Sequence, residues 1–127
     1  MNTVIVGFGS NIDPDINIPR AKEMIARDHA IRKESTFVTT KPVGYTKQND
    51  FVNGAVLIGT EMGIGELKIY LRNIEIQLGR TKDCIKGGPR TIDLDILAWN
   101  GKIIDQDFYT RDFLKNSVLE LAPDIKH

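Results

Sequence analysis

The sequence contains a single cysteine, Cys84, which excludes a disulfide within the chain and favours a reducing compartment. Basic and acidic residues number 17 each, so no net charge attracts the chain to nucleic acid or to a membrane surface. No apolar run approaches the ~20 residues of a membrane span. Residues 1–8 are too short and too uncharged for a secretory signal. These absences predict a cytoplasmic protein with no nucleic-acid or membrane partner, which recognises any anionic ligand through local groups.

Several catalytic signatures are also missing. The sequence has no P-loop, no Rossmann fingerprint, no zinc-binding pattern and no nucleophile elbow. The two histidines, His29 and His127, have no companions for a triad or a metal site. The chain has 127 residues, of which 41% are hydrophobic, and this is enough for one core but not for two. A single domain over residues 1–127 is therefore predicted.

Residues 87–97 are the most informative segment, because a glycine-rich basic loop runs directly into a strand with two carboxylates. Apolar and polar residues alternate from residue 90 onward, so Asp93 and Asp95 share one face of a half-buried strand. Two carboxylates ~5 Å apart repel by about 3 kcal/mol at an effective dielectric of ~20. Divalent cations would remove that repulsion and could bind a polyphosphate. The segment therefore predicts a metal–nucleotide site.

Basic residues gather just before this strand. Arg80, Lys82, Lys86 and Arg90 lie within eleven residues, opposed only by Asp83. Phosphoryl transfer depends mainly on positioning and on charge neutralisation, for which Mg²⁺ with Arg and Lys side chains is suited. An isolated pair of alternating aspartates would more simply be an exposed acidic strand. The cations beside this pair favour a functional site instead.

The hydrophobic pattern predicts strands at residues 3–8, 31–40, 51–58 and 90–99, with a short return strand at 102–104. It predicts helices from Pro19 to about Asp28, over residues 63–78 and over residues 113–121. The order strand, helix, strand, strand, helix, strand is that of the ferredoxin-like split βαβ (βαββαβ) arrangement. This is an α+β fold with an antiparallel sheet and helices packed on one face. The fold hosts many activities, so function has to be argued from the site.

Four further residues outside the basic loop are candidates. Glu75 lies in the last turn of the predicted helix over residues 63–78, where the helix dipole disfavours an acid, so a nearby cation is expected; Arg72 could be that partner. Asn53 is polar within an apolar strand and needs hydrogen-bond partners if it is buried. Phe51 and Phe113 could sandwich a flat ring. Taken singly, Asn53, Phe51 and Phe113 each fit a core position better than a binding site.

Together these segments resemble the 6-hydroxymethyl-7,8-dihydropterin pyrophosphokinase family, over most of the chain and in order. The resemblance rests on Gly9-Ser10-Asn11, residues 40–44 with Gln48 and residues 50–53, residues 74–80, and residues 88–97. It implies Mg²⁺-dependent transfer of pyrophosphate from ATP to a pterin alcohol, with release of AMP. The implied partners are the small-molecule substrates ATP and the reduced pterin. A monomer is expected, with a dimer as the alternative.

The resemblance also implies a role for each matching residue. Two Mg²⁺ ions would bind to Asp93 and Asp95, supported by Glu75. The residues expected to contact ATP and its phosphates are Arg80, Lys82, Arg90 and Arg111, the first three also acting in catalysis. The residues expected to bind the edge of the pterin or to stack on its faces are Thr40, Val43, Phe51, Asn53 and Phe113.

Two features depart from the family pattern. Asp105 and Gln106 stand where family members usually carry a histidine contact to ATP, and relatives commonly continue for tens of residues beyond the position of His127, so a shortened C-terminus is expected. These departures leave open a non-catalytic relative that binds pterin or nucleotide without transfer. A ferredoxin-like RNA-binding module is disfavoured by the neutral charge and the lack of an aromatic-rich RNP pattern. A palm-like nucleotidyl transferase is disfavoured by Gly88-Pro89-Arg90 and by the pterin-side residues.

Overall fold

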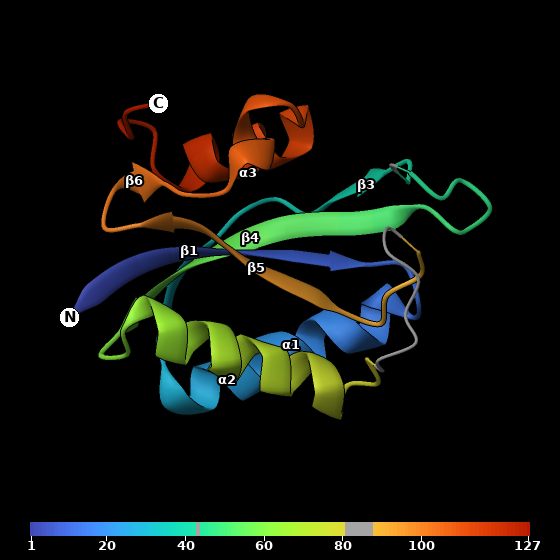
Figure 1. The fold of residues 1–127 in the computed structure, drawn as a ribbon, viewed down its shortest axis with the longest axis horizontal. Helices are drawn as coiled ribbons and strands as arrows, with labels where there is room; N and C mark the ends of the chain where they lie inside the picture. Colours follow the sequence, from blue (N-terminus) through green and yellow to red (C-terminus); the bar gives the residue numbers. More distant parts are fainter. Residues whose placement is uncertain (43, 81–87) are drawn as a thin grey trace.

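The computed structural model describes residues 1–42, 44–80 and 88–127 (Figure 1). In chain order the elements are β1 (Asn2–Ser10), α1 (Pro14–Asp28), β2 (Ala30–Glu34), β3 (Val38–Thr40), β4 (Phe51–Thr60), α2 (Ile64–Gln77), β5 (Asp93–Trp99), β6 (Lys102–Ile103), the 3₁₀ turn η1 (Gln106–Tyr109) and α3 (Asp112–Leu121). The predicted α+β, ferredoxin-like fold is confirmed.

The strands form one six-stranded antiparallel sheet in the order β2-β4-β1-β5-β6, and β3 also pairs with β4. β1 lies at the centre, between β4 and β5. In its register Gly9 is paired with Asn53 on one side and with Asp93 on the other. Gly7 is paired with Asp95. This register places Asn53 of β4 and Asp93 of β5 on the two sides of Gly9, and Asp95 beside Gly7.

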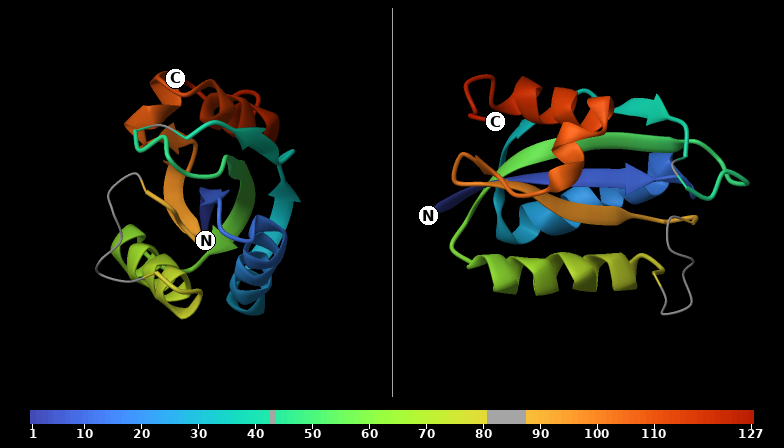
Figure 2. Two further views of the ribbon diagram at one scale, coloured as in Figure 1. Left: turned by 90° about the vertical axis from the view of Figure 1, so that its right-hand side faces the viewer. Right: turned by 45° about the horizontal axis from the view of Figure 1, so that its top comes forward.

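The two faces of the sheet are covered by different helices. α1 and α2 lie against one face, while α3 and the turn before it lie against the other (Figures 1 and 2). The larger apolar cluster lies under α1 and α2 and includes Phe8, Ile25 and Leu67. A smaller cluster under α3 includes Leu97 and Phe108. The two helices of the βαββαβ unit thus share one face, and α3 adds cover on the opposite face.

Helix α1 begins earlier than the sequence predicted. Pro14 lies in its first turn and Pro19 is inside the helix, so the predicted start at Pro19 is wrong. A proline in the first position loses no helical hydrogen bond, because that N–H has no partner within the helix. The amides of Ile16 and Asn17 both donate to the Asp13 carbonyl, which closes this first turn. Pro14 and Pro19 both suit a helix start, and the turn at Asp13 selects the first.

The predicted strand over residues 31–40 is divided into β2 and β3. Ser35 lies at the break, where its N–H donates to the Ala55 carbonyl and its hydroxyl accepts from the Ala55 N–H, both at 2.8 Å. A side-chain oxygen thus replaces a backbone carbonyl in the pairing with β4.

None of the helices in the described ranges has the length and apolar character needed to cross a membrane.

Candidate active site at the edge of β5

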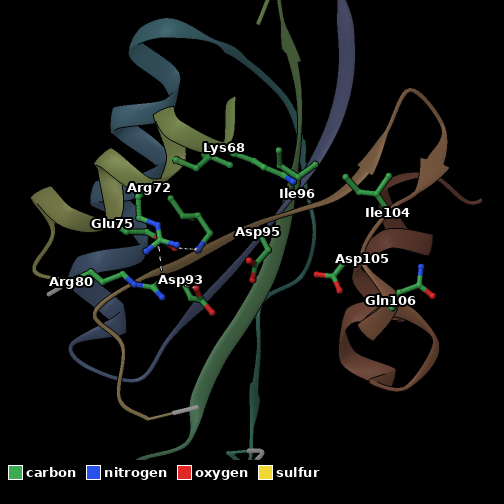
Figure 3. Close-up of a pocket in the computed structure, with 12 residues that line it drawn as sticks. Lys68, Arg72, Glu75, Arg80, Asp93, Asp95, Ile96, Ile104, Asp105 and Gln106 are labelled. Carbon is green, nitrogen blue, oxygen red and sulfur yellow. Dashed lines mark hydrogen bonds and ion pairs between the residues drawn. The ribbon is translucent and has the colours of Figure 1, made fainter. Parts of the chain in front are cut away.

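The predicted alternation along β5 is present. Leu94 and Ile96 are buried in the core under α1 and α2, while Asp93 and Asp95 lie on the opposite face. Both carboxylates line a cleft of about 450 Å³ (Figure 3). At the neighbouring Gly9, an added Cβ would lie 3.0 Å from Asn53 Oδ1 and 4.0 Å from the Asp93 Cβ. The absence of a side chain at Gly9 therefore keeps the space between Asn53 and Asp93 open.

The cleft has one wall from α2 and one from the segment that follows β6. Figure 3 shows Lys68, Arg72 and Glu75 on the α2 side, with Asp105 and Gln106 facing them across the cleft. The remaining lining residues, besides Arg80 and the two carboxylates, are the apolar Leu71, Leu94, Ile96 and Ile104. The cleft thus combines acidic groups, basic groups and an apolar surface.

Glu75 links α2 to β5. Its side chain is almost fully buried, and its Oε2 accepts a hydrogen bond from the Leu94 N–H at 2.8 Å. Oε1 lies 3.1 Å from Arg80 Nη1 and 3.4 Å from Arg72 Nε, so the expected compensating cation is present as two arginines. Burial raises the pKa of Glu75 above its ordinary value, and the Leu94 N–H and Arg80 oppose this rise. The carboxylate therefore joins two elements and fixes the position of Arg80.

Arg80 connects Glu75 to the aspartate pair. Its Nη1 lies 3.1 Å from Glu75 Oε1 and 3.3 Å from Asp93 Oδ1. One guanidinium nitrogen thus bridges a buried carboxylate and one at the cleft surface. The loop residue Lys82 and the pterin-side residue Val43, both predicted to act in the site, lie outside the described residues, as do Cys84 and Lys86.

Asp95 lies close to three other carboxylates, those of Asp93, Asp105 and Glu75. Limited hydration within the cleft raises its pKa to about 7, and repulsion from Asp93, Asp105 and Glu75 adds to this, while Arg80 opposes it. The Asp95 side chain is nevertheless open to the cleft, so a ligand can reach it. The concentration of carboxylates is unfavourable without a counter-ion, and a divalent cation would relieve it.

The donor set suits a cation that shares its ligands with a substrate. In the described part of the chain, no three His, Cys, Asp or Glu side chains are close enough together to hold a metal ion. Mg²⁺ is commonly held by one or two carboxylates and completes its shell with water and phosphate oxygens. Asp93 and Asp95 could therefore hold Mg²⁺ together with a polyphosphate, and they match that mode better than a cage made only of protein ligands.

A second, smaller pocket of about 150 Å³ lies beside the cleft. Four of the predicted pterin-side residues line it together: Thr40, Phe51, Asn53 and Phe113. The Asn53 Nδ2 donates to the Thr40 hydroxyl at 2.5 Å, which satisfies part of the amide that the sequence left without a partner. Asp93 lines both the pocket and the cleft, so the two spaces meet at this carboxylate.

Two of the arginines predicted to contact ATP, Arg90 and Arg111, line the smaller pocket instead of the cleft. The Arg90 guanidinium is buried and donates to the carbonyls of Gly88 at 3.2 Å and Pro89 at 2.9 Å. Arg111 Nη1 lies 3.6 Å from Asp107 Oδ2. Both arginines are thus close to Asp93 without bordering the larger cleft. Their contact with phosphate stays a prediction.

The sequence analysis did not predict that Lys68 and Asp105 line the cleft, or that Asn11 is buried. Lys68 could have been found from helical spacing, because it precedes Arg72 by four residues and Glu75 by seven and so shares their face. Asp105 precedes η1 and caps it, because its side chain accepts a hydrogen bond from the Asp107 N–H; only the fold brings it near Asp95. Ser10 and Asn11 are buried where β1 ends.

Comparison with known proteins adds a family. A family model described as 7,8-dihydro-6-hydroxymethylpterin-pyrophosphokinase (HPPK) matches residues 5–123. The chain is similar to the 2-amino-4-hydroxy-6-hydroxymethyldihydropteridine pyrophosphokinase of Bacillus subtilis, with 38% identity over 109 residues, covering 84% of this chain and 65% of the relative. It is 32% identical over 136 residues to the protein of the same name from Aquifex aeolicus, covering 100% of this chain and 84% of the relative.

A longer protein also matches. The chain is 30% identical over 135 residues to the Folic acid synthesis protein FOL1 of Dictyostelium discoideum. The matched region covers 99% of this chain and 20% of FOL1. The chain therefore spans about a fifth of FOL1 and slightly less than two thirds of the Bacillus subtilis protein.

Proposed function

Since the chain belongs to the 7,8-dihydro-6-hydroxymethylpterin-pyrophosphokinase family, we propose that it transfers pyrophosphate from ATP to 6-hydroxymethyl-7,8-dihydropterin and releases AMP. The observation that carries this proposal is the position of Asp93, which lines both the larger cleft and the smaller pocket. A transfer between two substrates needs two adjacent sites with the reacting groups at their junction. A carboxylate at that junction suits a reaction in which phosphate charge is neutralised.

The smaller pocket is the proposed site of the pterin. Asn53 and Thr40 offer an amide and a hydroxyl to the hydrogen-bonding edge of a heterocycle, and Phe51 and Phe113 line the same pocket. Aromatic rings pack favourably against a flat heterocycle and contribute beyond the area that they bury. Val43 would add a contact from the backbone. The pocket thus offers the two kinds of contact that a pterin can use.

The larger cleft is the proposed site of ATP. Its apolar lining residues Leu71, Ile96 and Ile104 suit a base, while Lys68 and Arg80 provide positive charge for phosphates. Lys82, Arg90 and Arg111 would contact the phosphates as these approach the acceptor. Asp93 and Asp95, together with phosphate oxygens, would hold the two proposed Mg²⁺ ions. When bound, these ions would neutralise charge and polarise the reacting oxygens.

Arg80 has a position from which it could serve the phosphates. Because Glu75 is buried and Arg80 pairs with it, this contact anchors the guanidinium from behind. The contact with Asp93 is longer, at 3.3 Å, and Asp93 is more exposed. Arg80 can give up Asp93 while keeping Glu75, and its remaining N–H groups can then donate to a phosphate. Glu75 is in this account a positioning residue for Arg80.

In the proposed reaction the hydroxymethyl oxygen attacks the β-phosphorus of ATP in line. The bond from that phosphorus to the oxygen of the α-phosphate breaks, the alcohol loses its proton, and AMP leaves. The residues of the chain orient both substrates and exclude alternative geometries, which contributes most of the rate in phosphoryl-type transfer.

The deciding assay measures AMP released by the purified protein with the reduced pterin, ATP and Mg²⁺. We expect AMP and the pterin pyrophosphate in equal amounts, and no AMP above background when the pterin is omitted. If the pterin protected the protein against thermal unfolding but no AMP appeared, the transfer proposal would be wrong. The chain would then be a non-catalytic relative that binds the pterin.

A further inference from the structure

Asn11 has a side chain that touches two loops at once. It is 3% exposed and follows the last residue of β1. Its Oδ1 accepts from the Arg90 N–H at 2.8 Å, and its Nδ2 donates to Gln48 Oε1 at 2.8 Å and to the Asn49 carbonyl at 3.0 Å. Arg90 and Gln48 are 42 residues apart in the sequence, and the Asn11 amide joins their two segments.

These contacts admit one orientation of the amide. The Arg90 N–H can only donate, so the Asn11 oxygen has to face it, and the two Nδ2 protons then face Gln48 and Asn49. The Asn11 and Ile12 N–H groups also donate to the Arg90 carbonyl, at 3.1 and 3.2 Å. Both peptide groups of Arg90 are therefore held by the turn after β1.

Each of the two loops leads into a strand whose residues line the smaller pocket. Residues 44–50 lead into Phe51 and Asn53 on β4, and residues 88–92 carry Arg90 and lead into Asp93 on β5. Asn11 lines neither the cleft nor the smaller pocket. Any effect it has on substrates must pass through the residues that it holds.

We propose that Asn11 is a positioning residue that couples the loop on the acceptor side to the loop carrying Arg90, so that ordering one loop favours the ordered form of the other. The identity of the ligands in this inference rests on the proposed function. The coupling between the loops does not, because it is set by hydrogen bonds within the chain. A group that satisfies two segments at once loses both sets of contacts when either segment moves away.

The first test uses the protein without ligands and follows amide hydrogen exchange. Asn11→Ala should speed exchange of the Arg90 amide by about tenfold or more, since a buried hydrogen bond is lost, and should also speed exchange in residues 45–50. Gln48→Ala removes the side-chain oxygen that accepts from Asn11 and leaves the Asn11 contact to Arg90 in place, and it should still speed exchange at Arg90. If Gln48→Ala changed exchange only within residues 45–50, the coupling would be refuted.

Asn17 provides a matched control. It is also a buried asparagine, and its Nδ2 donates to the Ile12 carbonyl at 2.6 Å, in the same turn. It has no hydrogen bond to either loop among the described residues. Asn17→Ala should lower stability as Asn11→Ala does, with Arg90 exchange changed no more than that of the turn as a whole. Equal acceleration at Arg90 in the two variants would assign the effect to general loosening and overturn the proposal.

The second test measures binding by calorimetry, with the reduced pterin titrated in the presence and absence of a non-hydrolysable ATP analogue and Mg²⁺. A mutual enhancement of affinity in the wild-type protein should shrink by about fivefold or more in Asn11→Ala and persist in Asn17→Ala. An enhancement unchanged in Asn11→Ala would contradict the proposal. A wild-type protein that binds neither ligand would refute the proposed function, and the exchange experiment would still decide the coupling.

Discussion

The larger cleft and the smaller pocket meet at Asp93 but differ in how their polar groups are satisfied. In the smaller pocket the Asn53 amide is already hydrogen-bonded to the neutral Thr40 hydroxyl. In the cleft, limited hydration and repulsion from the carboxylates of Asp93 and Asp105 raise the pKa of Asp95 to about 7. The pocket is thus arranged before ligand binds, whereas the cleft holds repulsion that a cation and a polyphosphate would relieve.

This difference separates two kinds of contribution. The uncharged residues of the smaller pocket should act mainly on acceptor affinity, because they would contact a neutral ring; these are Thr40, Phe51, Asn53 and Phe113. Residues of the cleft should act mainly on turnover, because charge is what changes during the transfer. Substitutions on the two sides should therefore affect different kinetic parameters.

The largest expected effect comes from Asp95→Ala. Removal of one carboxylate leaves an incomplete site for Mg²⁺, so turnover should fall by at least about a thousandfold. The affinity for the reduced pterin should change by less than about threefold, since the smaller pocket is intact. Steady-state AMP release and pterin calorimetry would measure the two quantities. A pterin affinity that fell as far as turnover would show that the two sides are not separate.

Arg80→Ala should reduce turnover by about a hundredfold, because a charge positioned by Glu75 for the phosphates is lost. Arg72→Ala is the matched control: Arg72 also pairs with Glu75, but its side chain is 59% exposed and it has no ion pair with Asp93. The control should lose less than about fivefold, as expected of a largely solvated pair. Similar losses in the two variants would remove the special position of Arg80.

Phe113→Ala should weaken binding of the reduced pterin by about tenfold, through loss of ring packing in the smaller pocket. Binding of a non-hydrolysable ATP analogue should be unchanged. Tyr109→Ala offers a control, because this aromatic residue of the neighbouring turn is 56% exposed and lines neither space. Titration of each ligand into each variant would show whether the aromatic contribution is confined to the acceptor side.

The smallest effect concerns pH. Without divalent cations, the folded protein binds a proton at Asp95 more tightly than the unfolded chain does, because its pKa is about 7 in place of 3.8. Stability contributed by this proton should be present at pH 5 and be lost as pH rises through about 7. Between pH 5 and a pH above 7, the Tm of the wild type should fall further than the Tm of Asp95→Asn. Equal drops would show that the cleft holds no such repulsion.

The local sequence pattern predicted some features of the fold and of the candidate site, but not others. The shared face of Asp93 and Asp95 follows from the period-two geometry of a strand, which each residue obeys whatever its tertiary surroundings. The helix over residues 63–78 is likewise set by its own apolar stripe, and α2 spans Ile64–Gln77. The family resemblance predicted five pterin-binding residues, and four of them line one pocket.

Features that depend on contacts between residues far apart in the sequence could not be predicted from the local pattern. The break at Ser35 depends on Ala55, twenty residues away, and the role of Asn11 depends on Arg90, 79 residues away. Such side-chain contacts to the backbone leave no periodic trace in the sequence. The start of α1 was mispredicted for a related reason, since both prolines fit and only the turn at Asp13 decides between them.

The most direct test of the separation between cleft and pocket is a crossed titration. The reduced pterin and a non-hydrolysable ATP analogue with Mg²⁺ would each be titrated calorimetrically into the wild type, Asp95→Ala and Phe113→Ala. We expect Asp95→Ala to weaken the Mg²⁺–nucleotide alone and Phe113→Ala to weaken the pterin alone. If both substitutions weakened the same ligand, or if each weakened both equally, the assignment of the two spaces to two substrates would be contradicted.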